Sequence, residues 1–518
     1  YIYGIYNYHI NWFFVEAYLA DEGGEFFDIS LKTYVLFSSV AVAVFFLELL
    51  ILWLVVTKLE PRTRFRHAGK LYASLVFMVV LFANVSHSWA YAKNYSAITS
   101  VGAHIPFYFP IHSRSLANNS LLSHLAGDDS GEQKVESNIY YPQHEMSCKA
   151  PKEKQPNVVM VVLESWRAEM MNKQVTPNTY ALAQDSLWFN DHHSSGNVTT
   201  KGIFALLYGL APTYMDNVVA NNGAGGPVFL NELKKRQYQF GIFPSGDITR
   251  IKLTDSSFAP VKEFVDHGVG ESIIEKDLDV LAKMNNMISA QSDPFFGFVF
   301  FNSPHYLYYY PPEFEKFTPN EKPSLVDFKQ GKDPLPYLNR YKNSLYFVDS
   351  LIKELVDNLK AQGKWDNTIL IITSDHAEEF ADTKATRFGH GSNFTPYQTH
   401  VPLIIHWPGK QAKAYSHRTA SIDVFSSLLD DAYKCENPMS DYSNGTSLFN
   451  EQSREVQVMA SYYNYAFVTA QGSFTQDPIG LLQSKDNEDK TNNNMKLSPR
   501  LAFSALQQMK WFYKKPKD

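Results

Sequence analysis

The chain has 518 residues, with 47 basic and 53 acidic side chains and a formal net charge of −6 at pH 7. This weakly negative balance excludes nucleic acid as the main partner, because binding along a phosphate backbone requires a basic surface. The length exceeds what a single hydrophobic core accommodates, so we expect a membrane part followed by one large soluble domain.

Two apolar stretches near the start of the chain predict transmembrane helices. Residues 34–57 and 71–92 each provide about the 20 residues that a bilayer core requires. Basic side chains lie between the stretches and acidic ones precede the first, so the positive-inside rule places the connecting loop in the cytoplasm and the later residues outside it. Glu48 lies within the first stretch, where we expect a helix contact or a protonated acid, with a functional role as the alternative. The aromatic-rich residues 1–14 resemble the end of another membrane segment, so we expect further helices upstream.

The remaining chain divides into a linker and a soluble domain. We assign residues 1–98 to the membrane region, 99–156 to a juxtamembrane linker rich in turn residues, and 157–518 to the soluble domain. The two cysteines, Cys148 and Cys435, either form one disulfide in an oxidising compartment or remain unrelated thiols.

Strand and helix patterns alternate in the soluble domain. The predicted strands are 157–163, 238–243, 295–301, 368–373 and 401–406, and the predicted helices are 176–186, 201–208, 228–236, 278–291 and 338–362. Because the strands are almost continuously apolar, we expect an α/β fold with a mostly parallel sheet sandwiched by helices. Two further strand-like pieces, 456–460 and 465–469, predict a small C-terminal subdomain.

Polar side chains follow three of these strands directly. Glu164 ends the first strand, His305 follows the strand 295–301, and Asp375 and His376 end the strand 368–373. Active sites of open α/β sheets lie at the carboxyl ends of the strands. Carboxylate oxygens together with an imidazole nitrogen suit Zn²⁺ or Mn²⁺. The sequence therefore predicts a divalent metal site with Glu164, Asp375 and His376 as ligands.

A threonine near this site is the candidate nucleophile. Thr199 stands where small polar residues lead into an apolar helix, so its hydroxyl would lie at a helix N-terminus that favours an alkoxide and an incoming anion. Metal coordination would lower the pKa of this hydroxyl further. Thr200 is the neighbouring candidate for the nucleophile. Alternatively, one of the two threonines only caps the helix.

Two further histidines are candidate substrate-binding residues. His305 and His390 would hold a phosphoryl oxygen, protonate a leaving group or bind a second metal, although single histidines are commonly core or surface residues. We assign no role to several other ionisable side chains in strands and loops: His400, His406, Lys201, Asp247 and Arg250.

The site motifs resemble those of the alkaline phosphatase superfamily, specifically its membrane-anchored branch with lipoteichoic acid synthases and phosphoethanolamine transferases. The motifs are residues 161–165 (VVLES), Thr199, residues 374–376 (SDH) and residues 389–391 (GHG). The resemblance implies an alkaline-phosphatase-like domain in which Glu164, Thr199, Asp375 and His376 bind the catalytic metal and Thr199 is the nucleophile.

Nearly the whole chain also resembles the inner-membrane sulfatase-like proteins of the YejM/PbgA type. The resemblance rests on residues 86–92 (SHSWAYA), 195–197 (SGN), 202–204 (GIF), 405–409 (IHWPG) and 448–450 (LFN). The resemblance implies a multi-pass protein of the bacterial inner membrane with five membrane helices, of which this chain would hold the last two, and a periplasmic C-terminal domain. It also implies a role in lipopolysaccharide or cardiolipin homeostasis.

These expectations combine into one function and one alternative. The first is a metal-dependent phosphoester hydrolase or phospho-group transferase that acts on a lipid-linked phosphate in the periplasm. A true sulfatase is disfavoured, because neither cysteine lies near Thr199 and no motif for formylglycine formation is present. The alternative is a non-enzymatic, lipid-sensing regulator that uses the domain as a scaffold, while the linker and the membrane helices bind lipid or a regulatory membrane protein partner.

Overall fold

The structure is a computed structural model that describes residues 31–54, 66–92, 139–149, 154–221, 223–290, 294–323, 331–383, 387–462, 464–476 and 482–513. Its α-helices are α3 (Leu31–Leu54), α4 (Arg66–Ala92), α7 (Pro177–Gln184), α8 (Thr199–Tyr208), α9 (Met215–Ala220), α10 (Val228–Lys235), α11 (Ile273–Ala290), α12 (Leu335–Ala361), α13 (Pro396–Thr399), α14 (Val424–Asp431) and α15 (Pro499–Lys510). Its strands are β1 (Asn157–Leu163), β2 (Leu187–Phe189), β3 (His192–His193), β4 (Gln239–Pro244), β5 (Phe295–Phe301), β6 (Thr368–Ser374), β7 (Glu379–Phe380), β8 (Phe388–Gly389), β9 (Leu403–His406), β10 (Lys413–Tyr415), β11 (Thr419–Ala420), β12 (Gln457–Ala460), β13 (Tyr465–Thr469), β14 (Gly472–Gln476) and β15 (Leu482–Asp486).

A seven-stranded sheet forms the centre of the α/β domain, in the order β10-β2-β9-β6-β1-β5-β4. The neighbours β6, β1, β5 and β4 run parallel to one another. β9 is antiparallel to both β6 and β2, whereas β10 is parallel to β2. The predicted α/β fold with a mostly parallel sheet is therefore confirmed, with β9 as the reversed strand.

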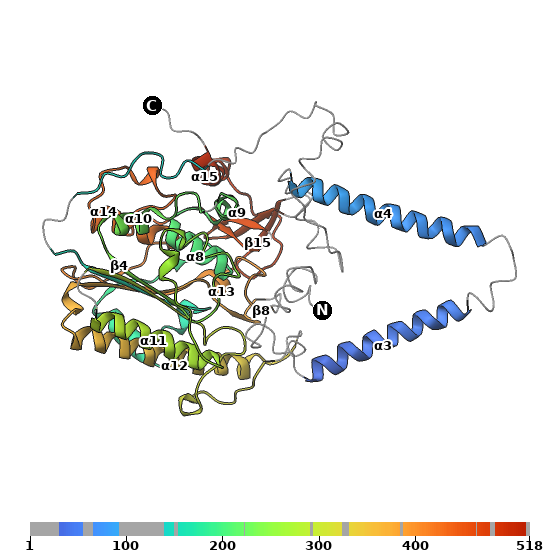
Figure 1. The fold of residues 1–518 in the computed structure, drawn as a ribbon, viewed down its shortest axis with the longest axis horizontal. Helices are drawn as coiled ribbons and strands as arrows, with labels where there is room; N and C mark the ends of the chain where they lie inside the picture. Colours follow the sequence, from blue (N-terminus) through green and yellow to red (C-terminus); the bar gives the residue numbers. More distant parts are fainter. Residues whose placement is uncertain are drawn as a thin grey trace.

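Helices cover both faces of this sheet (Figure 1). Alternate residues of β1 point to opposite faces, so Val158 and Met160 pack in the core beneath α8, α10 and α14, whereas Val159 and Val161 pack against α11 and α12. Every residue of β1, β5 and β6 is buried. A sheet that is covered on both sides explains why these strands are unbroken apolar runs.

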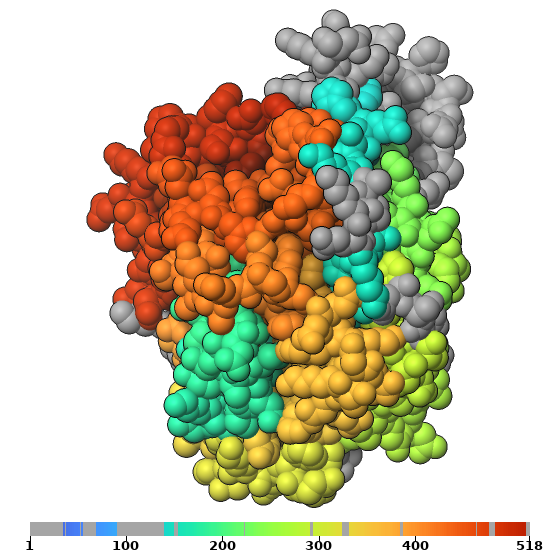
Figure 2. Space-filling model, turned by 90° about the vertical axis from the view of Figure 1, so that its left-hand side faces the viewer, coloured from blue at the N-terminus to red at the C-terminus, as the bar shows by residue number. Residues whose placement is uncertain are grey.

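The C-terminal part of the chain adds a second, antiparallel sheet, in the order β12-β13-β14-β15, and the helix α15. The predicted strand pieces 456–460 and 465–469 correspond to β12 and β13. Figure 2, which views the molecule from the side opposite α3 and α4, shows this red C-terminal segment continuous with the orange residues that precede it.

The helices α3 and α4 extend away from the α/β domain (Figure 1). Among the described residues, a single helix, Gly69–Ala90, is both long and apolar enough to cross a membrane, and it corresponds to the predicted span 71–92. In α3 the apolar helical stretch is the shorter Ser38–Ile51, and residues 55–57 of the predicted first span lie outside the described part. The prediction of two transmembrane spans is therefore confirmed only in part. Most of the predicted linker, residues 99–138, also lies outside the described part.

Cys148 and Cys435 form a disulfide. The bond joins the segment 139–149, which precedes β1, to the chain that follows α14. The same segment contacts the domain through Tyr141, whose hydroxyl donates a hydrogen bond to the carbonyl oxygen of Tyr208 at 2.6 Å. The structure therefore selects the paired alternative of the two that the sequence leaves open.

Candidate metal centre

The carboxyl ends of two adjacent parallel strands bring Glu164, Asp375 and His376 together. Glu164 follows β1, and Asp375 and His376 follow β6, whose last residue Ser374 pairs with Leu163 of β1. All three side chains are buried, with 2%, 1% and 0% of their surface exposed. The spatial proximity expected from the sequence is therefore present.

The imidazole of His376 lies between the two carboxylates. Its Nε2 atom is 3.2 Å from Oε1 of Glu164 and 3.3 Å from Oδ2 of Asp375. Its Nδ1 lies 3.1 Å from the carbonyl oxygen of Ala377, and a proton on Nδ1 would donate to that oxygen. In this tautomer the lone pair of Nε2 faces the carboxylates, as a metal ligand requires.

Thr199 brings a hydroxyl to the same point from the first residue of α8. Its Oγ1 atom is 3.3 Å from Oε2 of Glu164 and 3.4 Å from Nε2 of His376. The Thr199 side chain is partly exposed, in contrast to the three buried side chains beneath it. The four predicted metal ligands thus converge, with the hydroxyl on the accessible side.

Small residues allow α8 to approach the strand ends this closely. A Cβ atom on Gly202 would lie 2.1 Å from the carbonyl oxygen of Asp375, and one on Gly196 would lie 2.5 Å from the backbone nitrogen of Gly202. The hydroxyl of Ser194 donates a hydrogen bond to the same Asp375 carbonyl oxygen. Sequence reasoning missed these supporting roles, although a glycine in the first turn of a helix, where helix propensity disfavours it, was a signal.

The electrostatics of the buried group favour a cation. Burial, together with the charge of Glu164, raises the pKa of Asp375 to about 8. Burial opposes protonation of His376, but the charges of Asp375 and Glu164 prevail and raise its pKa to about 9. Burial also raises the pKa of Glu164, yet the charge of His376 and its hydrogen bond bring this pKa well below its usual value. Two buried carboxylates therefore compete for one positive partner, which is a situation that a divalent ion relieves.

The hydrogen bonds of Asp375 test whether the residues fit a metal. Its Oδ1 atom accepts hydrogen bonds from the backbone N–H groups of Ser165, at 3.1 Å, and His376, at 2.8 Å. Its Oδ2 atom is buried and accepts no hydrogen bond from the described residues. One potential ligand atom each from Glu164, Asp375 and His376 lie within 4.8 Å of one another. Two carboxylates and one imidazole thus fit a divalent cation of the Zn²⁺ or Mn²⁺ class.

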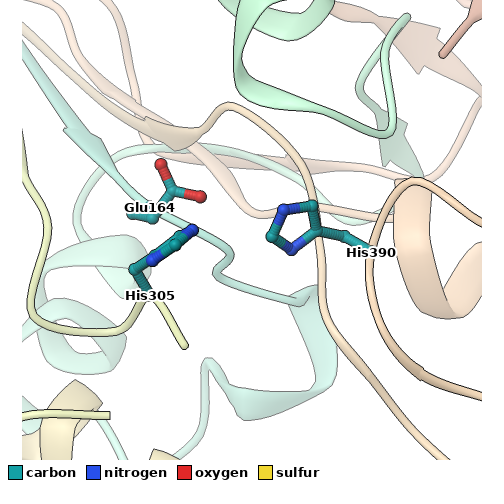
Figure 3. Close-up of side chains that lie close together, drawn as sticks. All are labelled: Glu164, His305 and His390. Carbon is teal, nitrogen blue, oxygen red and sulfur yellow. The ribbon is translucent and has the colours of Figure 1, made fainter. Parts of the chain in front are cut away.

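The two other predicted histidines lie at the same centre. His305 and His390 converge with Glu164 from separate loops (Figure 3), and one potential ligand atom from each of the three lies within 4.8 Å of the others. The ring centroids of His376 and His390 are 4.1 Å apart, and those of His305 and His390 are 5.7 Å apart. Burial lowers the pKa of His305, so its imidazole is neutral at pH 7. All six residues that the sequence assigns to the site are therefore neighbours.

Sequence reasoning missed Glu378, which contacts His390. One oxygen of the buried Glu378 carboxylate is 2.7 Å from Nδ1 of His390, and the other accepts a hydrogen bond from the hydroxyl of Tyr308 at 2.8 Å. Burial raises the pKa of Glu378, but the charge of His390 and the hydrogen bonds outweigh burial and lower it. The ionised carboxylate fixes a proton on Nδ1 of His390. The position of Glu378, two residues after His376, was the available signal.

Comparisons with known proteins agree with this fold. The sequence model of the family described as Sulfatase matches residues 156–432, and that of a domain of unknown function, DUF3413, matches residues 1–148. The inner membrane protein YejM of Salmonella typhimurium is 25% identical over 467 residues, which is 88% of this chain and 72% of that protein.

Two solved structures share the alkaline-phosphatase-like fold. A protein in the alkaline phosphatase superfamily from Vibrio parahaemolyticus has a TM-score of 0.53 at 19% identity, over 73% of this chain and 92% of that one. The lipoteichoic acid synthase LtaP from Listeria monocytogenes has a TM-score of 0.52 at 15% identity, over 71% of this chain and 95% of that one. Because the Sulfatase model matches more than half of the chain, the protein belongs to the sulfatase family.

Proposed function

We propose that the protein is a membrane-anchored, metal-dependent phosphoester hydrolase or phospho-group transferase that acts on a lipid-linked phosphate in the periplasm. The observation that carries this proposal is the meeting of Glu164, Asp375 and His376, with the hydroxyl of Thr199 no more than 3.4 Å from two of them. A nucleophile beside a divalent-metal ligand set is the arrangement that phosphoryl transfer needs.

Glu164, Asp375, His376 and Thr199 would hold the cation. A bound Zn²⁺ or Mn²⁺ lowers the pKa of a coordinated hydroxyl and neutralises negative charge on a phosphoryl oxygen. Thr199 lies at the N-terminus of α8, where the helix dipole favours both its alkoxide form and an incoming anion. The alkoxide of Thr199, its proton lost to water, would attack phosphorus and form a phosphothreonine as the bond to the leaving oxygen breaks. Attack by water or an acceptor alcohol on this phosphorus would then release the Thr199 oxygen.

His305 and His390 are proposed to bind the substrate. With Nδ1 of His390 held by Glu378, the Nε2 atom of His390 is the one available to a substrate oxygen. From Nε2, His390 would donate a proton to the leaving oxygen. The neutral His305 would donate a hydrogen bond to a phosphoryl oxygen.

Phosphate esters suit this chain better than sulfate esters. Sulfatases in the strict sense make a formylglycine from a cysteine or serine at the nucleophile position, whereas here that position is Thr199. Cys148 and Cys435 are joined in a disulfide and are unavailable for this modification. A threonine nucleophile fits phosphoryl transfer.

Several observations support a periplasmic, membrane-tethered location. The relative from Salmonella typhimurium is named an inner membrane protein. The helix Gly69–Ala90 meets the requirements of a membrane span, and a disulfide is typical of proteins in oxidising compartments. A tether would confine the domain near a lipid-linked substrate and raise the effective concentration of that substrate.

Hydrolysis of a chromogenic phosphodiester, bis(p-nitrophenyl) phosphate, by the purified protein with Zn²⁺ or Mn²⁺ tests the proposal. Thr199→Ala should lower kcat by about 10³-fold or more, because it removes the nucleophile. Thr200→Ala, the neighbouring control, should retain kcat. Full activity of the Thr199→Ala variant would end the nucleophile assignment. An inactive wild-type protein that retains no stoichiometric metal would favour the non-enzymatic regulator instead.

A further inference from the structure

We propose that Asp191, His193 and His400 form a second transition-metal site of the Zn²⁺ class, which shares no ligand with the centre at Glu164. One potential ligand atom from each of the three residues lies within 4.8 Å of the other two. Two imidazoles and one carboxylate, with a remaining position for water, are a common ligand set for zinc. This inference does not depend on the proposed catalytic function.

An isolated antiparallel bridge brings the two histidines together, and Asp191 lies beside them. His193, in β3, forms an antiparallel bridge with His400, so the two are cross-strand neighbours. Their rings stack with centroids 4.9 Å apart and planes 20° apart. Asp191 lies in the turn that leads into β3, two residues before His193. The Oδ1 atom of Asp191 is 2.8 Å from Nε2 of His193.

Each imidazole has an outer hydrogen bond that leaves its other nitrogen available. Nε2 of His400 lies 2.9 Å from the carbonyl oxygen of Asn190 and must donate to it, so Nδ1 carries the lone pair. Nδ1 of His193 lies 3.4 Å from Oγ1 of Thr399, whose own proton is donated to the carbonyl oxygen of Thr395 at 2.9 Å. The Thr399 oxygen is therefore free to accept a hydrogen bond from a protonated Nδ1 of His193 when a cation displaces the proton from Nε2. Such outer hydrogen bonds are typical of histidine metal ligands.

The surrounding charges keep the ligands in the protonation states that a metal requires. Burial, aided by the charge of Arg418, lowers the pKa of His193 well below its usual value. Burial raises the pKa of Asp191, but its hydrogen bond with His193 and the charge of Arg418 prevail and lower it to about 2. At pH 7 the carboxylate is ionised and the imidazole of His193 is neutral. Arg418 repels a cation, and the adjacent negative charge of Asp191 offsets this repulsion.

The site is open to solvent through Asp191. The side chain of Asp191 is 43% exposed and that of His193 is 4% exposed, so an ion can approach from the side of Asp191. Bound there, the ion would cross-link β3 to the segment that follows α13. Next to them, Ser194 donates a backbone hydrogen bond to Thr399 of α13 at 2.8 Å, and Ala377, which follows His376, donates one to Gln398 of α13 at 3.1 Å. The second ion would therefore stabilise the support of the catalytic loops.

Counting zinc in the purified full chain tests the inference. Zn²⁺ per chain is measured by competition with a chromogenic chelator, with Mg²⁺ as the ion that should not bind at this site. Asp191→Asn, which keeps an oxygen next to His193, and His400→Ala should each lose one equivalent of Zn²⁺ relative to the wild type. Both variants should also lose part of the rise in unfolding temperature that Zn²⁺ causes. His406→Ala is the matched control, since this partly exposed histidine stacks on Trp365 away from the cluster.

Two outcomes separate this inference from the proposed function. His376→Ala should remove the other equivalent of Zn²⁺ and leave the one at Asp191 in place. If folded Asp191→Asn and His400→Ala proteins, judged by circular dichroism, bind as much Zn²⁺ as the wild type, the second site does not exist. That result would not contradict the proposed metal centre at Glu164. Likewise, an inactive wild-type protein would not contradict the second site.

Discussion

Replacing Gly202 by alanine isolates the contribution of close packing to the metal centre. The added Cβ would lie 2.1 Å from the carbonyl oxygen and 2.9 Å from the carbonyl carbon of Asp375. Reaching ordinary contact requires the N-terminal turn of α8 to move away by about 1 Å or more. That turn carries Thr199, so the hydroxyl would move relative to Glu164 and His376.

The expected effects on stability and on catalysis differ in size. Alanine favours a helix over glycine by about 1 kcal/mol, whereas overpacking costs about 1–3 kcal/mol, so the free energy of unfolding should fall by at most about 2 kcal/mol. A displacement of about 1 Å of a reacting group lowers the rate by about 100-fold. We therefore expect a folded protein whose kcat for bis(p-nitrophenyl) phosphate is about 100-fold lower.

The assay combines urea denaturation with phosphodiester hydrolysis, and Gly246→Ala serves as the control. The nearest atom to a Cβ on Gly246 would be Nδ2 of Asn302, at an ordinary 3.6 Å, so this variant should retain its activity. A Gly202→Ala protein with wild-type kcat would refute the argument that contact between α8 and Asp375 positions Thr199.

Two further predictions concern residues outside the metal ligand set. Glu378→Gln should lower kcat by about 10–100-fold with little change in KM, because an amide no longer fixes the proton on Nδ1 of His390. Steady-state kinetics with good and poor leaving groups measure this, and an equal kcat for wild type and variant with the poorer leaving group would contradict it. Replacing Cys148 and Cys435 by serine should lower the free energy of unfolding by about 2–5 kcal/mol, because the bond constrains the unfolded chain. Urea denaturation of the double variant tests this, and an unchanged midpoint would contradict it.

The sequence predicts the central strands because their burial leaves a simple pattern. β1, β5 and β6 are buried on both faces, so their unbroken apolar runs are recognisable without a structure. The direction of β9 was not predictable, since an apolar strand has the same pattern whether it runs parallel or antiparallel. β15 was missed because it consists mainly of polar, partly exposed residues at the edge of the second sheet.

The site was predictable to the extent that its residues directly follow strands. Glu164, Asp375 and His376 occupy such positions, and parallel strands bring their carboxyl ends to one edge. Glu378 lies beyond the strand in a segment without periodicity, and its contacts depend on how that segment folds back. His193 and His400 meet through an isolated bridge between distant segments, which no local pattern reveals, and so the sequence gives no reason to assign a role to His400.

The most direct test of the metal centre is a crystal structure of the zinc-loaded protein with anomalous diffraction measured on both sides of the zinc absorption edge. We expect an anomalous peak bonded to Glu164, Asp375 and His376, with the hydroxyl of Thr199 as a further ligand. A structure in which zinc is present in the crystal but no peak lies among these residues would contradict the account.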